Sequence, residues 1–181
     1  MASMRDIKRR RTSISSTQQI TKAMKLVSTV KLQKARGRAE DVSPYFNATY
    51  QTICSMLSKV GEIEHPYLKK RDEGKKLIVT ISSNRGLAGG YNSNVAKLIT
   101  TSDLKKEDVE IYAIGHKAEE QLVHRGYKVT GDDNDVMEAP TYSDASRICT
   151  DLLERFKSGE ISEIWLAYTH FKNTVVHVPT L

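Results

Sequence analysis

The sequence predicts an α/β protein in which a long amino-terminal helix precedes a domain built on a mostly parallel sheet. Two observations support this prediction. Residues 1–36 contain no glycine and no proline, and apolar side chains recur there at helical spacing. After residue 75, short β-branched apolar runs alternate with amphipathic stretches. That alternation is typical of strands and helices that build a parallel sheet.

The amino-terminal helix is predicted over residues 1–60. Every seventh residue falls on one line along it, flanked on the same face by three more apolar residues: Ile7, Ile14, Thr21, Ser28, Ala35 and Val42, with Ile20, Met24 and Val27. We expect a bend near Pro44, because proline lacks a backbone donor. A helix of this length would extend roughly 90 Å. So narrow a stripe cannot bury itself, so we expect a coiled-coil partner or a surrounding protein.

Charge separates this helix from the rest of the chain. Residues 1–40 hold eleven Lys or Arg against two acids, a net charge of +9, whereas the remainder is mildly acidic. A mitochondrial transit peptide is one alternative interpretation, but the helical stripe continues past any cleavage point. A nucleic-acid-binding arm is another, because Lys8–Arg11 is a basic run. No aromatic residue precedes Tyr45 to stack on bases, which disfavours it.

A polar linker is predicted over residues 61–75, where glycine, His-Pro and a charged run interrupt the helical pattern. The body domain follows over residues 76–181. Its predicted strands cover 76–82, 109–115, 127–129, 161–171 and 174–178, and its helices cover 92–101, 116–125 and 143–157. This order predicts a Rossmann-like, mostly parallel sheet.

A glycine-rich loop over residues 83–92 follows the first predicted strand, where nucleotide-binding folds place their phosphate loop. Its glycines, Gly86, Gly89 and Gly90, fit neither the G-x-G-x-x-G pattern nor a P-loop, and no Lys-Ser/Thr pair follows them. Phosphate binding stays open, but the spacing favours a tight turn that lets strand and helix pack closely. We expect no cofactor.

The sequence predicts no catalytic residue and no metal site. His116, Glu120 and His124 could share one helical face, but no fourth ligand is placed beside them, so a solvated face is favoured. No Gly-x-Ser-x-Gly motif is present, and Cys54 and Cys149 fit no metal-ligand pattern. No apolar run is long enough to span a membrane.

Three stretches resemble the ATP synthase γ subunit family. The first is Met4–Arg10 followed by Ser16–Val27, which contains the core Thr-x-x-Ile-Thr-Lys-Ala-Met. The second is the glycine-rich loop over residues 83–92, and the third is the late strand Tyr168–Thr174. The similarity extends over essentially the whole chain.

The resemblance implies a non-catalytic central rotor stalk that couples proton or sodium flow through the membrane to ATP synthesis or hydrolysis. The basic helix would enter a ring of α and β subunits, and the body would lie near the ε subunit and the c-ring. The subunit would be peripheral, on the cytoplasmic side of a bacterial cell membrane rather than at the mitochondrial inner membrane. It would contact membrane only through the complex, and no nucleic acid. The alternative is a nucleotide-binding α/β protein with a basic nucleic-acid-binding arm.

The resemblance also assigns interface residues. Lys22, Met24 and Lys25 fall where the family's helix meets the moving parts of the catalytic subunits, and Arg9 and Arg10 lie nearer the interior of the ring. Tyr45 lies toward the foot of the stalk. Chains of this family continue into a second long helix that coils against the first. Because this sequence stops at Leu181, directly after a predicted strand, we expect that helix to be missing from it.

Overall fold

The computed structural model describes residues 3–61, 64–71 and 73–181, and the chain forms two compact units that divide between Ile63 and Glu64. Part of the predicted linker, at positions 62, 63 and 72, lies outside the described residues. Each unit is described by itself.

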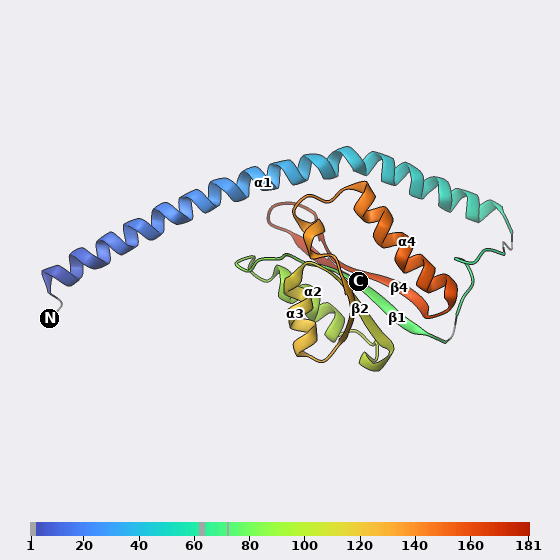
Figure 1. Ribbon diagram of the computed structural model, residues 1–181. Helices are drawn as coiled ribbons and strands as arrows, with labels where there is room; N and C mark the ends of the chain where they lie inside the picture. Colours follow the sequence, from blue (N-terminus) through green and yellow to red (C-terminus); the bar gives the residue numbers. More distant parts are fainter. Residues whose placement is uncertain (1–2, 62–63, 72) are drawn as a thin grey trace. The chain divides into compact units, whose positions relative to one another are not determined.

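The first unit is one long helix, α1, over Met4–Lys59 (Figure 1). A capping box begins it: the Ser3 hydroxyl accepts from the Arg5 N–H at 3.3 Å, and the Asp6 carboxylate accepts from the Ser3 N–H at 3.2 Å. Pro44 lies inside the helix, so the N–H that would bind the carbonyl four residues earlier is missing there. All residues of α1 are described and none of them is buried.

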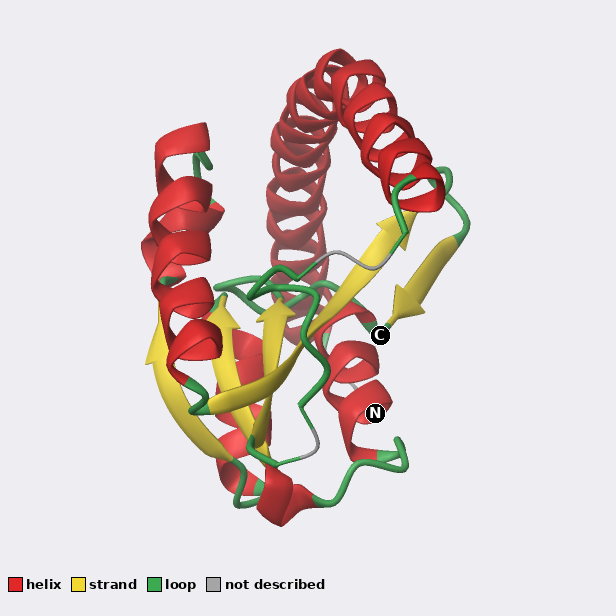
Figure 2. Cartoon of the chain, turned by 90° about the vertical axis from the view of Figure 1, so that its right-hand side faces the viewer, coloured by secondary structure: helices red, strands yellow, loops and turns green. Residues whose placement is uncertain are grey.

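The second unit is built on a five-stranded sheet with the order β3-β2-β1-β4-β5 (Figure 2). The strands are β1 Lys75–Ile81, β2 Val109–Ile114, β3 Lys128–Asp132, β4 Ile161–Phe171 and β5 His177–Thr180. The first four run parallel, and β5 pairs antiparallel with β4. The predicted α/β class, with a long helix and a mostly parallel sheet, is therefore confirmed.

Helices cover both faces of this sheet (Figure 1). Helices α2 Tyr91–Thr100 and α3 His116–His124 pack on one face, and α4 Tyr142–Ser158 packs on the other. Successive residues of a strand point to opposite faces, and β1 supplies both cores in this way. Ile78 lies in the core under α2 and α3, whereas Leu77 and Val79 lie in the core under α4. Burial on both faces explains why β1 reads as a continuous apolar run.

The last strand begins later than predicted. A strand over 174–178 was expected, but β5 begins at His177. Asn173 explains the shift, because its side-chain oxygen accepts from the N–H groups of Val175, at 2.9 Å, and Val176, at 2.8 Å. These hydrogen bonds hold Val175 and Val176 in the turn, although valine favours strands.

A buried ion-pair network joins three elements of the second unit. The Glu110 side chain on β2 accepts from Lys128 Nζ at 2.6 Å and from Arg155 Nη2 on α4 at 2.7 Å, and the residue is 5% exposed. Burial by itself raises the pKa of this carboxyl, but the two cationic donors outweigh burial, and the pKa lies below its usual value. The network fixes α4 to the β2–β3 edge of the sheet.

Candidate partner-binding surface on the long helix

The apolar stripe predicted on α1 is solvent-exposed along its length. Ile7, Ile14, Ile20, Met24 and Val27 are all at least half exposed. Scattered apolar side chains on a surface need no explanation, but a contiguous row of them marks an interaction surface. The stripe is therefore the first candidate for a functional surface.

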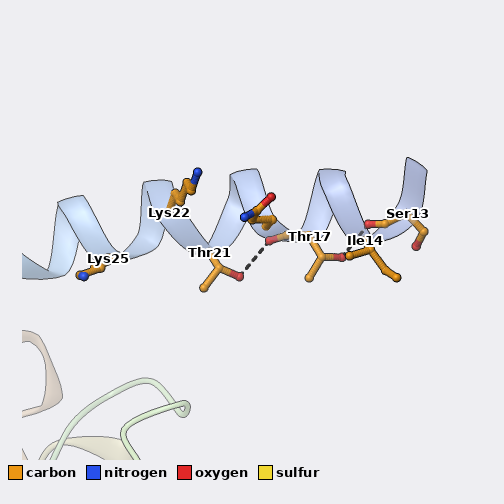
Figure 3. Close-up of a pocket in the computed structure, with 7 residues that line it drawn as sticks. Ser13, Ile14, Thr17, Thr21, Lys22 and Lys25 are labelled. Carbon is orange, nitrogen blue, oxygen red and sulfur yellow. Dashed lines mark hydrogen bonds between the residues drawn. The ribbon is translucent and has the colours of Figure 1, made fainter. Parts of the chain in front are cut away.

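Two hollows follow one another along this stripe. Ile14, Thr17, Gln18 and Thr21 line the second of them, together with Ser13, Lys22 and Lys25 (Figure 3). The first lies one heptad earlier and is lined by Ile7, Arg10, Arg11 and Ile14, with Ser15 and Gln18. In each hollow, four residues are spaced 0, 3, 4 and 7 along the helix. Four residues at that spacing form the hole that receives a side chain from a neighbouring helix in a coiled coil.

The threonines of the second hollow direct their hydroxyls to their own helix. Thr17 Oγ1 donates to the Ser13 carbonyl at 3.0 Å, and Thr21 Oγ1 donates to the Thr17 carbonyl at 2.8 Å (Figure 3). A hydroxyl that is satisfied in this way needs no polar partner. The methyl groups are left to contact an incoming side chain, so the hollow suits an apolar one.

The structure brings three of the six predicted interface residues to these hollows. Arg10 lines the first, and Lys22 and Lys25 border the second. Arg9 lines a smaller hollow beside Asp6. Within the described part of the chain, none of these four cations forms an ion pair. Their charge is therefore available to a partner that carries carboxylates.

The other two predicted residues lie outside the hollows. Met24 is 50% exposed and belongs to the apolar stripe, and Tyr45 is 75% exposed directly after Pro44. Sequence reasoning missed Arg11, Thr17 and Gln18, which complete the two hollows. The signal was present in the sequence as the 0, 3, 4, 7 spacing around Ile7 and Ile14.

The glycine-rich loop is held by side-chain amides of this chain. Asn92 is buried, and its oxygen accepts from both the N–H and the hydroxyl of Ser83 at 2.9 Å. At the start of α3, the Gly115 N–H donates to Asn134 Oδ1 at 2.9 Å, and the His116 N–H donates to Asn84 Oδ1 at 3.1 Å. Backbone N–H groups at a helix start are the donors that a bound phosphate uses. At the start of α3 asparagine oxygens take up two such groups, whereas the N-cap of α2, the helix that follows the loop, has no side-chain capping hydrogen bond. The glycine spacing, which matches neither phosphate-binding pattern, is therefore what favours the interpretation of the loop as a structural turn.

The histidine face of α3 pairs with neighbouring residues. His116 Nδ1 lies 3.3 Å from a Glu119 carboxylate oxygen, and Lys117 donates to Glu120 at 2.6 Å. The described residues contain no group of three or more His, Cys, Asp or Glu side chains placed to hold a metal ion. Among the helices described, none is long and apolar enough to cross a bilayer.

Comparison with known proteins shows which family the chain resembles. The family model described as "ATP synthase" matches residues 3–181. The "ATP synthase gamma chain" of Lachnoclostridium phytofermentans is 59% identical over 181 residues, which cover 100% of this chain and 62% of the relative. That of Alkaliphilus metalliredigens is 42% identical over 176 residues, covering 97% of this chain and 61% of the relative.

A third relative is the "ATP synthase gamma chain, sodium ion specific" of Acetobacterium woodii. It is 37% identical over 172 residues, which cover 95% of this chain and 57% of the relative. The chain thus spans about three fifths of the length of these curated relatives. Because the family model matches almost every residue and the gamma chain relatives align over nearly the whole of it, this chain belongs to the ATP synthase gamma chain family.

Proposed function

We propose that this chain is part of the central rotor stalk of an ion-translocating ATP synthase, and that it is not itself catalytic. The observation that carries the proposal is the pair of hollows on α1, one heptad apart and bordered by unpaired cations. The hollows would receive the side chains of a second long helix of the same subunit. The neighbouring cations would face the α and β subunits of the catalytic ring.

The mechanism follows from the weakness of the contacts that α1 offers. A rod that is polar on most faces can turn inside a sleeve, because sparse charged contacts exchange easily whereas a large apolar contact would trap one angle. Nucleotide binding would change which β-subunit conformation suits each face of the rod. Rotation and nucleotide affinity are then linked reciprocally, since each equilibrium biases the other.

The finer assignments belong to the same proposal. Arg9, Arg10, Lys22, Met24, Lys25 and Tyr45 contact neighbouring subunits. Residues 1–60 form the rotor helix, bent near Pro44, residues 61–75 form the linker, and residues 76–181 form a body that meets the ε subunit and the c-ring. The complex lies on the cytoplasmic side of a bacterial cell membrane. The family match and the exposed stripe on α1 support these assignments.

Co-purification from membranes tests the proposal. The tagged chain, expressed within the complete subunit, should bring down α, β and ε subunits at fixed stoichiometry. Ile14→Asp should weaken this association indirectly, because a carboxylate in the wall that both hollows share would disturb their contact with the second helix and so the rod that the α and β subunits surround. Absence of α and β subunits from the purified material would contradict the proposal.

Leu26→Asp is the matched control. Leu26 is 68% exposed and Ile14 is 69% exposed, so the two substitutions remove similar exposed apolar groups. Leu26 lies about 140° around the helix from Thr21, away from the hollows. Leu26→Asp should leave the association unchanged. An equal loss in both variants would show that the assembly does not depend on the hollows.

A further inference from the structure

An exposed tyrosine–leucine pair followed by three cations precedes β1. Tyr67 is 47% exposed and Leu68 is 50% exposed, and Lys69, Lys70 and Arg71 come directly after them. We call residues 67–70 the Tyr67–Lys70 patch. It lies within the second unit and belongs to neither of the α1 hollows.

The patch is fixed to the carboxyl end of α4. The Leu68 N–H donates to the His65 carbonyl at 3.0 Å, which closes a turn. The Tyr67 ring centroid lies 6.4 Å from that of Phe156. The Arg71 guanidinium lies over the same ring at 4.7 Å, and its Nη2 donates to the Lys157 carbonyl at 3.0 Å. The exposed side chains of the patch are therefore presented from an anchored turn.

Three cations and one acid line the hollow beside the patch, and Glu62, Glu64 and Asp72 also flank it in the sequence. Lys69, Lys70 and Arg71 line a shallow hollow with Ser158 and Gly159, and Glu73 is the one acid among its described lining residues. Neither Lys69 nor Lys70 forms an ion pair with any described residue. Arg71 Nη1 is buried without a partner in the same part of the chain. Lys69 and Lys70 are thus the side chains of the patch that can meet an anion.

This combination suits the interface of a lipid bilayer. Tyrosine favours the headgroup level, leucine reaches the acyl boundary, and lysines extend to anionic headgroups. We propose that the Tyr67–Lys70 patch binds the surface of a bilayer that contains anionic phospholipid. Arg71 is the forked donor of the hollow, but it is held by the Phe156 ring and the Lys157 carbonyl. The exposed cations are the ammonium groups of Lys69 and Lys70, which recognise diffuse charge. The proposal departs from the expectation that the subunit contacts membrane only through the complex, and it does not depend on the rotor function.

Vesicle binding by the complete chain, with Tyr67→Trp as a local reporter, tests the proposal. Trp165 emission from the parent chain is subtracted. With vesicles of phosphatidylcholine and phosphatidylglycerol, the reporter should shift to shorter wavelength and be quenched by lipids labelled near the headgroup. Vesicles of phosphatidylcholine alone should cause neither change. Leu68→Trp is a second reporter, which guards against loss of the Tyr67 contact with Phe156.

Charge variants separate the patch from the basic arm. Lys69→Gln with Lys70→Gln should abolish the wavelength shift of the reporter tryptophan per sedimented chain. The basic helix α1 should still bind these chains to the vesicles. The matched pair Lys31→Gln with Lys34→Gln removes two cations of α1 instead. It should raise the lipid concentration needed for sedimentation and leave the wavelength shift per bound chain unchanged. Sedimentation without a shift in either reporter would overturn the proposal, and so would a shift that survives the loss of Lys69 and Lys70. In those cases an acidic protein becomes the better partner for the patch.

Discussion

At Met24, half of the side chain is exposed on the stripe of α1, and Lys22 and Lys25 lie beside it in the sequence. Met24→Lys, made in the complete subunit, should impair coupling more than folding. A third cation there changes contacts with neighbouring subunits, but it touches neither core of the sheet domain nor a helix cap. The free energy of unfolding should change by less than about 0.5 kcal/mol. ATP hydrolysis and proton pumping are compared in membrane vesicles.

Leu26→Lys is the control for this substitution, because it adds the same charge away from the stripe. Pumping should fall more than hydrolysis in the Met24 variant and in that variant alone. Equal losses of hydrolysis and pumping would argue against a coupling role for Met24.

Glu110 links stability to pH. Its pKa lies below the usual value in the folded chain, so it contributes stability above the pKa of an unfolded glutamate, and this contribution is lost as pH falls through the folded pKa. Glu110→Gln should lower the free energy of unfolding by about 1–3 kcal/mol near pH 7, because two charged hydrogen bonds are lost.

Urea unfolding measures this effect at neutral and acid pH. The difference between the parent chain and Glu110→Gln should shrink toward about pH 3, below the usual glutamate pKa. Glu154→Gln is the control, because Glu154 is an exposed acid of α4, and it should change stability little at either pH. A difference that does not depend on pH would contradict the ion-pair account.

At the scale of elements, α1 depends on a partner. Most helix stability in proteins comes from packing an apolar face, and α1 buries no residue. The run Lys8–Arg11 adds repulsion between neighbouring cations. In the dilute monomer, amides of residues 1 to 35 should therefore exchange rapidly with solvent.

Hydrogen exchange followed by mass spectrometry measures this, with the sheet domain as the internal reference. Protection of α1 should appear when a second helix or the catalytic ring is added. Strong protection of the amides over Ile20–Val30, with no partner present, would show that α1 is stable by itself.

The elements that sequence predicts well are those with a local cause. The apolar β-branched runs of β1 and β2 predicted buried parallel strands, and apolar residues at helical spacing predicted α4. The predicted start of β5 was wrong because the turn before it is held by hydrogen bonds to a single side chain, that of Asn173. The ion-pair partners of Glu110 are Lys128 and Arg155. Both lie far from Glu110 in the sequence, so no local sequence pattern could predict these contacts.

The candidate site divides in the same way. The stripe through Ile7 and Ile14 was visible as a seven-residue repeat. The hollows needed Thr17 and Gln18 as well, and polar residues carry no weight in a search for apolar periodicity. The contacts of the six interface residues with other subunits stay a prediction, because they depend on chains outside this one.

At the scale of the whole molecule, the sheet order resembles that of a dinucleotide-binding fold, yet we expect no nucleotide to bind. Asn84 and Asn134 occupy backbone donors at the start of α3, and Asn92 accepts from the Ser83 N–H in the loop before α2. The glycines of that loop match neither phosphate-binding pattern. Calorimetry with ATP, ADP and NAD on the complete chain should give no saturable heat at about 0.15 M salt, where weak attraction to the basic arm is screened. A micromolar dissociation constant would contradict this interpretation.

The bonds of Asn134 also show what chemical ageing at this residue would disturb. Its amide nitrogen donates to the carboxylates of Glu119, at 3.1 Å, and Asp132, at 3.2 Å, while its oxygen holds the start of α3. Asparagine side chains lose ammonia spontaneously in water and become carboxylates. At this position the change would replace a shared donor with a third negative charge, and like charges at such distances oppose one another's ionisation. An old sample would then differ from a fresh one where the segment after β3 meets the start of α3, although both were made from the same gene.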